Sequence, residues 1–250
     1  MSDEVDLELR RRTRRGFITA AVAAGAGYAS WKWLRTRPRI EGVEWPLRRM
    51  LEANESLAGA YFSPARLSPN FHPSDVTRAR LNGRIGLQSA LDLDAWRLNI
   101  EGAAGAGAEG AAAPVAVTLD EIRALPRHDQ ITELRCIEGW SIIVKWTGAR
   151  LVDLMAKYPP AETPKYVSLQ TPDRAYYVGL DIESAIHPQT LLAYEMNGSP
   201  LAPLHGAPLR LAIPVKYGIK NLKRIGTIRY TNVRPADFWG ERGDDWYIGH

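Results

Sequence analysis

A single cysteine, Cys136, occurs in the 250-residue chain, so no internal disulfide can hold the fold together. The fold must therefore rest on a hydrophobic core, and a composition of 45% hydrophobic residues supplies enough apolar material for one. A chain of this length commonly forms one large domain. A lone cysteine is most often a small buried apolar residue. Its surroundings must therefore indicate whether Cys136 binds a metal, attacks a substrate or fills space.

Basic charge is concentrated at the N-terminus. Residues 1–40 hold nine Arg and Lys against four Asp and Glu, which gives +5, whereas the rest of the chain holds 23 basic and 24 acidic residues, which gives −1. The remainder is therefore close to neutral, and we predict no nucleic-acid partner.

Residues 1–40 have the pattern of a targeting segment. A charged start leads to Arg14-Arg15-Gly16-Phe17-Ile18, and an Ala/Gly-rich, weakly apolar run follows. Two arginines, one spacer and Phe resemble a twin-arginine export signal, a route that carries folded proteins, often with a cofactor already installed. The alternative is an ordinary basic tail before a short helix.

The sequence leaves open whether this segment is removed. Residues 17–34 span about 18 residues, the lower limit for crossing a membrane, but the run is poor in large apolar side chains and no clear Ala-x-Ala site follows it. We expect the protein in the periplasm or at the outer face of the cytoplasmic membrane. The segment is either cleaved or retained as an anchor.

The rest of the chain is predicted to be an α+β single domain with mixed β-sheets and short helices. Residues 41–92 are expected to form an irregular extension with a helical stretch at 46–52, and residues 93–250 to form the main domain. The Gly/Ala tract at 102–113 is expected to be a surface loop. No Gly-x-Gly-x-x-Gly is present, which argues against a dinucleotide fold. Hydrophobic patterns predict strands at 95–101, 130–137, 165–170, 175–179, 190–196, 209–213 and 225–230, and helices at 118–126 and 150–158.

Two sequence blocks carry a family resemblance. The first is Arg135-Cys136-Ile137-Glu138-Gly139-Trp140-Ser141 with Trp146-Thr147-Gly148 after it, and the second runs from Leu204 to Lys223. In order and separation they resemble the sulfite-oxidase-type molybdopterin-binding oxidoreductase domain, and more narrowly the catalytic subunits of periplasmic methionine-sulfoxide reductases. The resemblance extends from about residue 95 to 232. It implies that residues 93–250 form a molybdopterin-binding catalytic domain with the sulfite-oxidase-type fold.

The resemblance implies a molybdenum-molybdopterin cofactor (Mo-MPT). Cys136 then acts as the metal ligand, because a soft thiolate suits molybdenum and coordination keeps it deprotonated. Arg210 offers a planar fork to the cofactor phosphate, and Lys223 offers a point charge. The implied catalytic residues are Cys136 and Tyr217, and the implied cofactor-binding residues are Thr171, His205, Arg210, Asn221, Leu222 and Lys223.

Each of these residues also has a purely structural interpretation. Thr171 could be a strand residue, His205 a turn residue and Tyr217 part of the core. Lys216, Lys220, Lys223 and Arg224 could form one solvated basic face. The upstream Tyr61-Phe62-Ser63 is similar to a cofactor-contacting segment of the family but lacks its Asn.

The implied reaction is two-electron oxygen-atom transfer. The substrate would be a small-molecule or protein-bound sulfoxide such as methionine sulfoxide, with electrons arriving from a membrane haem subunit. Sulfite oxidases carry clustered arginines just after the cysteine, where this chain has Glu138-Gly139-Trp140, and a C-terminal immunoglobulin-like dimerisation domain. About nineteen residues follow Thr231, too few for that domain. Both absences favour the sulfoxide-reductase branch of the family. We expect the chain itself to be a monomer.

Three alternatives remain. The first, which keeps the same cofactor, is a sulfite oxidase or dehydrogenase-like activity. A peroxide-reactive thiol protein without molybdenum would need a cation such as Arg135 to lower the pKa of Cys136. A membrane-tethered binding protein with an inert Cys136 is the third.

Overall fold

The computed structural model describes residues 2–104 and 114–249. Most of the predicted loop at 102–113 therefore lies outside the described residues. The chain divides into two compact units, Met1–Met50 and Leu51–His250. The boundary falls within helix α2 (Trp45–Tyr61).

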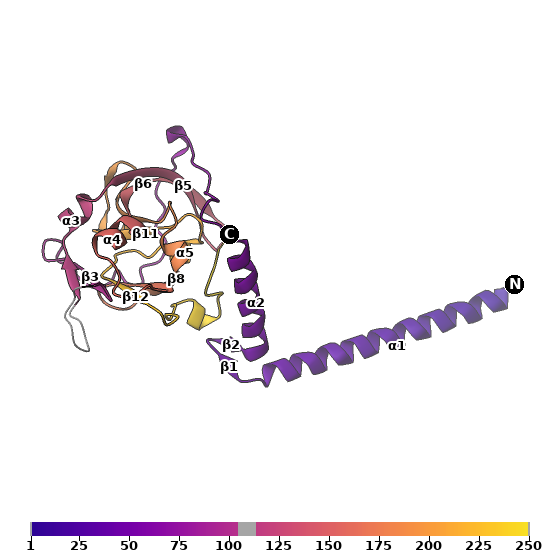
Figure 1. Cartoon of the computed structure of the whole chain (residues 1–250). Coiled ribbons are helices and arrows are strands. Elements are labelled where there is room, and N and C mark those ends of the chain that lie inside the picture. Colours follow the sequence, from indigo (N-terminus) through magenta and orange to yellow (C-terminus); the bar gives the residue numbers. More distant parts are fainter. Residues whose placement is uncertain (1, 105–113, 250) are drawn as a thin grey trace. The chain divides into compact units, whose positions relative to one another are not determined.

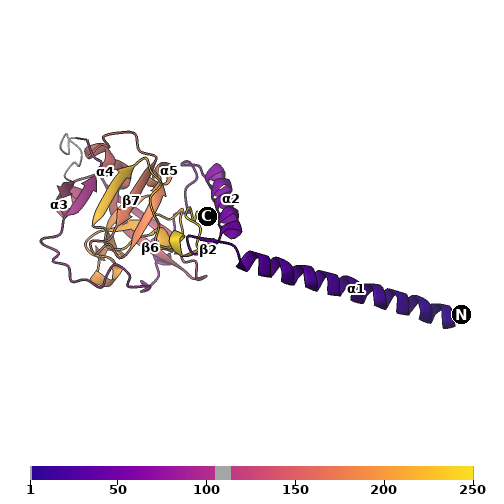
Figure 2. The same ribbon diagram turned by 90° about the horizontal axis from the view of Figure 1, so that it is seen from below.

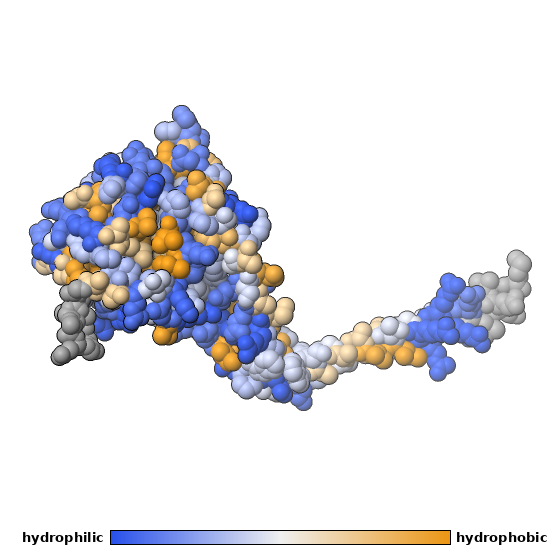
Figure 3. All heavy atoms as spheres, in the orientation of Figure 1, coloured by the Kyte–Doolittle hydropathy of each residue, from blue (hydrophilic) through white to orange (hydrophobic). Residues whose placement is uncertain are grey.

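The first unit consists mainly of helix α1 (Ser2–Arg35), followed by a short antiparallel pair, β1 (Arg39–Ile40) and β2 (Val43–Glu44). Figure 3 shows an apolar stretch of α1 that follows a strongly hydrophilic one. Phe17 and Trp31 are among its exposed side chains. Within the described residues, no helix combines the length and the apolar character needed to cross a membrane.

The second unit contains two five-stranded sheets in its described part (Figure 1). In the first, the strand order is β10-β9-β6-β5 and β11 also pairs with β9, always antiparallel. Its strands are β5 (Arg127–Arg135), β6 (Ser141–Arg150), β9 (Leu191–Met196), β10 (Ser199–Pro200) and β11 (Arg210–Ala212).

The second sheet has the order β4-β3-β12-β7-β8, and its β3–β12 pair is parallel. Its strands are β3 (Leu98–Glu101), β4 (Val115–Val117), β7 (Tyr166–Gln170), β8 (Tyr177–Asp181) and β12 (Thr227–Thr231). Three short helices connect the strands: α3 (Leu119–Arg123), α4 (Leu151–Lys157) and α5 (Ile182–Ala185) (Figure 2). The predicted α+β class with mixed sheets and short helices is confirmed.

The core is formed by side chains of both sheets and of α4. Leu98, Leu169 and Ile228 of the second sheet are completely buried, as are Leu192 of β9 and Leu154 of α4. A smaller cluster lies on the other side of β6 and includes Val144 and Trp146. Strand β6 therefore contacts apolar side chains on both faces.

The predicted helices and strands overlap observed ones, but one long strand is missing from the prediction. The seven predicted strands overlap β3, β5, β7, β8, β9, β11 and β12, and the predicted helices overlap α3 and α4. No strand is predicted at 141–150, although β6 has 10 residues. The helix predicted at 46–52 extends to Tyr61 as α2, so the expected irregular extension is regular over this part.

Candidate functional site

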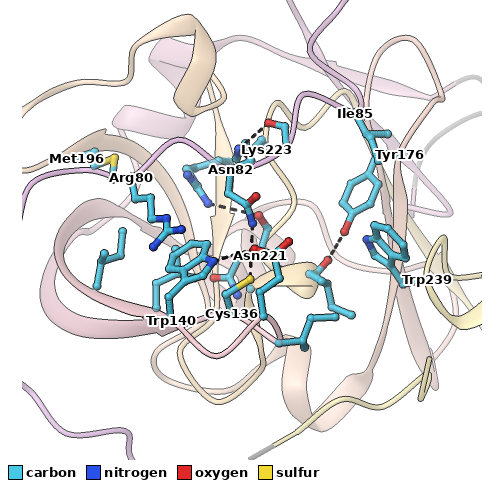
Figure 4. Close-up of a pocket in the computed structure, with 18 residues that line it drawn as sticks. Arg80, Asn82, Ile85, Cys136, Trp140, Tyr176, Met196, Asn221, Lys223 and Trp239 are labelled. Carbon is cyan, nitrogen blue, oxygen red and sulfur yellow. Dashed lines mark hydrogen bonds between the residues drawn. The ribbon is translucent and has the colours of Figure 1, made fainter.

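A cavity of about 250 Å³ lies beside Cys136 (Figure 4). Most of its lining comes from three parts of the second unit: residues 80–85, the end of β5 with the turn into β6, and the second sequence block. Tyr176, Met196 and Trp239 complete it. The lining residues include Arg80, Asn82, Ile85, Cys136, Glu138, Trp140, Tyr176, Met196, Arg210, Asn221, Lys223 and Trp239.

Cys136 directly follows β5 and is held by a tight turn. Its backbone N–H donates to Trp140 O at 2.9 Å, and Gly139 N–H donates to Cys136 O at 3.1 Å. Gly139 has φ +87°, a conformation that glycine adopts without steric cost. The side chain is 6% exposed, and burial raises the pKa of the Cys136 thiol. A raised pKa is the opposite of what the peroxide-reactive alternative requires.

Asn82 lies against the sulfur and is not among the predicted site residues. Its Nδ2 is 3.5 Å from Cys136 Sγ, and Lys223 Nζ donates to the carbonyls of Asn82 and Gly83. The resemblance places the family's upstream Asn near Tyr61-Phe62-Ser63, where this chain lacks it. That segment lines a different cavity of about 290 Å³. The Asn-Gly pair at 82–83 in the long irregular stretch is the signal that could have identified Asn82.

Arg210 is a buried cation with an unused donor. Its Nη1 and Nη2 donate to the carbonyls of His205 (3.1 Å) and Asn221 (3.3 Å), and its guanidinium lies 4.6 Å from the centroid of the Trp146 ring. Its Nε has no hydrogen-bond partner, and burial lowers the pKa of Arg210 to about 10. A buried charge of this kind is stabilised by an anionic ligand.

Lys223 is the second cation of the cavity. Burial, and next the charge of Arg210, lower the pKa of Lys223 to about 8. Two neighbouring cations, one of which lowers the pKa of the other, are suited to binding a phosphate between them.

Asn221 fixes the backbone that carries these groups. Its Oδ1 accepts from Ile213 N–H at 2.8 Å, and its Nδ2 donates to Tyr217 O at 3.2 Å. The side chain is 5% exposed. Asn221 lines the cavity and also ties β11 to the 3₁₀ turn at Gly218–Lys220.

Four other predicted residues do not line the cavity. Thr171 is buried and caps a turn, where its Oγ1 donates to Asp173 at 2.6 Å. Leu222 packs into the hydrophobic core. The backbone N–H of Tyr217 donates to Ile248 O at 3.3 Å. His205 lies near the two cations, and burial followed by the charges of Arg210 and Lys223 lowers its pKa. Their assigned roles stay predictions.

The alternative of a solvated basic face is wrong for three of its four members, namely Lys216, Lys220 and Arg224. Arg224 is 5% exposed and donates to Ser89 O at 3.0 Å. Lys216 and Lys220 are each 1% exposed. Lys220 pairs with Asp237 at 2.5 Å, and Lys216 lies 3.6 Å from Asp181. These two lysines therefore take part in ion pairs inside the fold.

The outer part of the cavity combines an aromatic ring with opposite charges. Trp140 Nε1 donates to Glu138 Oε2 at 2.9 Å, and the Arg80 guanidinium lies 4.4 Å from the centroid of the Trp140 ring. Figure 4 shows Arg80 and Trp140 on one side of the cavity and Tyr176 and Trp239 on the other.

The donor set fits the cofactor that the resemblance implies. The described residues contain no group of three or more His, Cys, Asp or Glu side chains that could hold a metal. Cys136 would therefore be the protein ligand to a metal whose other sulfurs belong to the pterin, with Arg210 and Lys223 placed for the phosphate.

Comparison with known proteins agrees with this reading. Residues 85–239 match the model of the oxidoreductase molybdopterin-binding domain family, so the match begins upstream of residue 93, where the domain was predicted to start. A protein of Azospira oryzae, provisionally named protein-methionine-sulfoxide reductase subunit YedZ1, is 34% identical over 212 residues, which cover 84% of this chain and 78% of that protein.

Two further similarities cover smaller parts of this chain. The protein-methionine-sulfoxide reductase catalytic subunit MsrP of Xanthomonas campestris is 38% identical over 141 residues, which cover 50% of this chain and 44% of that protein. The match thus spans less than half of that relative. The sulfane dehydrogenase SoxCD of Paracoccus pantotrophus has a TM-score of 0.51 and 18% identity over 58% of this chain and 40% of that chain, which shows similarity of fold alone.

Proposed function

Because this chain belongs to the oxidoreductase molybdopterin-binding domain family, we propose that it reduces sulfoxides by two-electron oxygen-atom transfer. Family membership makes it an enzyme with a molybdopterin cofactor. The proposed substrates are small-molecule or protein-bound sulfoxides such as methionine sulfoxide. The names of the Azospira and Xanthomonas relatives support this substrate class.

The observation that carries the substrate assignment is the pair of side chains after Cys136. Glu138 and Trp140 line the cavity where a sulfite-binding site would need several cations. A carboxylate beside a sulfite dianion would repel it, whereas a sulfoxide group is neutral. The apolar carbons of a sulfoxide can also pack against the Trp140 ring.

Each residue of the site has a definable task in this reaction. The cofactor, when bound, supplies the two-electron chemistry, and the protein supplies binding, orientation and electrostatics. Cys136 would hold the metal, and Arg210 with Lys223 would hold the phosphate. Asn82 can orient the sulfur through its amide, which lies 3.5 Å from Sγ. Glu138 and Trp140 form the wall against which the substrate lies.

The electron donor and the location belong to the same proposal. We place the enzyme in the periplasm or at the outer face of the cytoplasmic membrane, exported by its twin-arginine segment and reduced by a membrane haem subunit. Arg14, Arg15 and Phe17 lie together on exposed α1, where an export receptor could read them. The word "subunit" in the names of both relatives supports a partner chain.

The first experiment measures the metal. The wild-type chain, produced in a pterin-competent host, should contain about one molybdenum atom per chain by elemental analysis, because one thiolate serves one metal. Cys136→Ser should lose it. Ile137→Val, at the exposed neighbouring position, is the matched control and should retain it. Wild-type protein that lacks molybdenum would overturn the cofactor assignment.

The second experiment separates the reactions. Molybdenum-loaded enzyme is assayed for sulfoxide reduction with a reduced viologen dye and for sulfite oxidation with ferricyanide. We expect turnover of methionine sulfoxide and dimethyl sulfoxide, with little turnover of sulfite. Turnover of sulfite alone would contradict the proposed substrate class while leaving the cofactor assignment intact.

A further inference from the structure

Arg80 is a cation of the cavity that the cofactor assignment leaves without a task. It lines the same cavity as Cys136, and its guanidinium lies over the Trp140 ring, 4.4 Å from the centroid. Among residues 2–104 and 114–249, its side chain makes no ion pair or hydrogen bond. Its five N–H donors are therefore available to a ligand.

The backbone on both sides of Arg80 is anchored. Three residues earlier, Thr77 N–H donates to Ile143 O of β6 at 3.0 Å, and Asn197 Nδ2 donates to Thr77 O at 3.2 Å. Ala79 packs against the cluster that includes Val144 and Trp146. On the other side, Lys223 Nζ donates to the Asn82 and Gly83 carbonyls. The two anchors hold the short segment between them at the cavity.

The charges of the cavity fall into two groups. Arg210 is buried at 3% exposure and Lys223 is half-buried, and these two lie side by side next to the phosphate position assigned above. Arg80 is exposed and lies beside Trp140, whose Nε1 donates to Glu138. Figure 4 shows Lys223 with Asn82, apart from the Arg80–Trp140 pair. The outer group therefore has one cation and one carboxylate.

We propose that Arg80 is a specificity-determining residue that binds a carboxylate of the substrate while the sulfoxide group lies near Cys136. The proposal rests on the proposed function and names its substrate class, namely sulfoxides that carry a nearby carboxylate, as free methionine sulfoxide does. A guanidinium presents a planar fork that matches a carboxylate. Trp140 restricts this fork from one side, so less rotamer freedom is lost on binding.

A single arginine suits a monoanion at this place. Glu138 accepts a hydrogen bond from Trp140, which also contacts Arg80, and its charge offsets part of the attraction that Arg80 exerts on a distant anion. A carboxylate that reaches the guanidinium directly still gains a bidentate contact. A sulfite dianion would need further cations, which the outer group does not contain.

The test compares a sulfoxide that carries a carboxylate with its neutral ester, and with a small sulfoxide that has no carboxylate. N-acetylmethionine sulfoxide, its methyl ester and dimethyl sulfoxide are assayed with molybdenum-loaded enzyme and a reduced viologen dye. Wild-type enzyme should favour the acid over the ester in kcat/KM by about tenfold, the size of one charge-assisted contact in a partly exposed site. Arg80→Gln should abolish this preference by raising KM for the acid, and leave the ester and dimethyl sulfoxide within about twofold.

Two variants serve as controls. Arg80→Lys keeps the charge without the fork and should retain part of the preference. Arg84→Gln removes an exposed arginine of the same segment that does not line the cavity, so it should behave like wild type. Equal kcat/KM for acid and ester in wild type, or an equal loss for all three substrates in Arg80→Gln, would overturn the proposal.

A binding measurement distinguishes failure of this proposal from failure of the proposed function. Titration calorimetry of the holoenzyme with N-acetylmethionine and its methyl ester reports the carboxylate contact without turnover. Tighter binding of the acid by wild type, lost in Arg80→Gln, supports the Arg80 site even if no sulfoxide is reduced. Reduction of dimethyl sulfoxide together with equal binding of acid and ester would refute the Arg80 site and leave the sulfoxide reductase function standing.

Discussion

At the scale of single residues, the candidate site combines one thiol with a buried and a half-buried cation. Arg210 and Lys223 lie in the same cavity as Cys136, and no carboxylate pairs with either of them in the described part of the chain. Burying unpaired charge costs free energy unless a ligand compensates it. The fold therefore holds these residues in a state that an anionic cofactor would stabilise.

Cofactor retention should depend on pH through Lys223. Its pKa is lowered to about 8, and a bound phosphate raises it again because the phosphate favours the protonated amine. The affinity for the phosphate is then highest below pH 8. It falls by up to tenfold per pH unit as the pH rises from about 8 to the pKa of Lys223 in the bound state. The measurement is the pterin retained by the holoenzyme after gel filtration at pH 7 and pH 9.5.

Two substitutions sharpen this measurement. Lys223→Arg keeps its positive charge across this pH range, so the retained pterin should no longer decrease between pH 7 and pH 9.5 through this residue. Lys223→Gln should bind the pterin weakly at both pH values. Equal retention by wild type at both values would show that Lys223 does not bind the phosphate.

The sequence allowed the thiol and the two cations to be predicted, but not Asn82 or Arg80. Cys136, Arg210 and Lys223 belong to contiguous blocks whose residue types indicate their chemistry. Asn82 and Arg80 lie in a stretch without periodicity, where the path of the chain depends on distant contacts such as Thr77 with Ile143. Thr171 and Leu222 are also predicted from the resemblance, but their side chains do not line the cavity, so their proposed contacts with the cofactor stay predictions.

At the scale of elements, strand β6 connects the site to the core. It pairs with β5 along its length and with β9 along its second half, and a register shift occurs between Thr147 and Gly148. Its first residues come directly after the turn that holds Cys136. Ile142, Val144 and Trp146 alternate as expected for a strand with one buried face. Further along β6 both faces are buried, which hides this alternation in the sequence.

Gly148→Ala should destabilise the protein. A Cβ at this position would lie 2.2 Å from Leu192 O and 2.8 Å from Ala193 Cα, so the β6–β9 pair would have to separate. Overpacking of this kind costs about 1–3 kcal/mol, and Tm falls by roughly 2–4 °C for each kcal/mol in a domain of this size. Thermal unfolding followed by circular dichroism measures the shift.

Gly59→Ala provides the control within a helix. Nothing lies within 4 Å of a Cβ at Gly59, and alanine favours helix by about 1 kcal/mol over glycine. Its Tm should equal or exceed that of wild type. A Gly148→Ala protein that is as stable as wild type would show that β6 and β9 can move apart without cost.

At the scale of the whole molecule, the chain consists of an N-terminal unit with the Arg14-Arg15 pair and a larger unit with the candidate site. The two sheets and their order could not be derived from the sequence, because the parallel β3–β12 pair joins segments separated by more than a hundred residues. The family resemblance supplied the fold that local patterns could not.

Export should depend on the arginine pair of α1. Replacing Arg14 and Arg15 together by Lys should keep the protein in the cytoplasmic fraction, because the signal is read by its arginines and not by its charge. The equivalent pair of substitutions at Arg11 and Arg12 preserves the same charge and should leave export unchanged. Fractionation followed by immunoblotting measures both, and export of the Arg14/Arg15 variant would refute the signal assignment.

The anchored segment around Arg80 has a consequence for redesign of the substrate range. The family model begins at residue 85, so Arg80 and Asn82 lie outside the region that it matches although both line the cavity. The proposed substrate contact at Arg80 and the proposed cofactor contacts at Cys136, Arg210 and Lys223 therefore lie on different segments of the chain. Because Asn82 lies against the sulfur and Lys223 holds the same short stretch, substitution of Arg80 alone, and not exchange of the whole stretch, is the route that should change substrate range without disturbing cofactor binding.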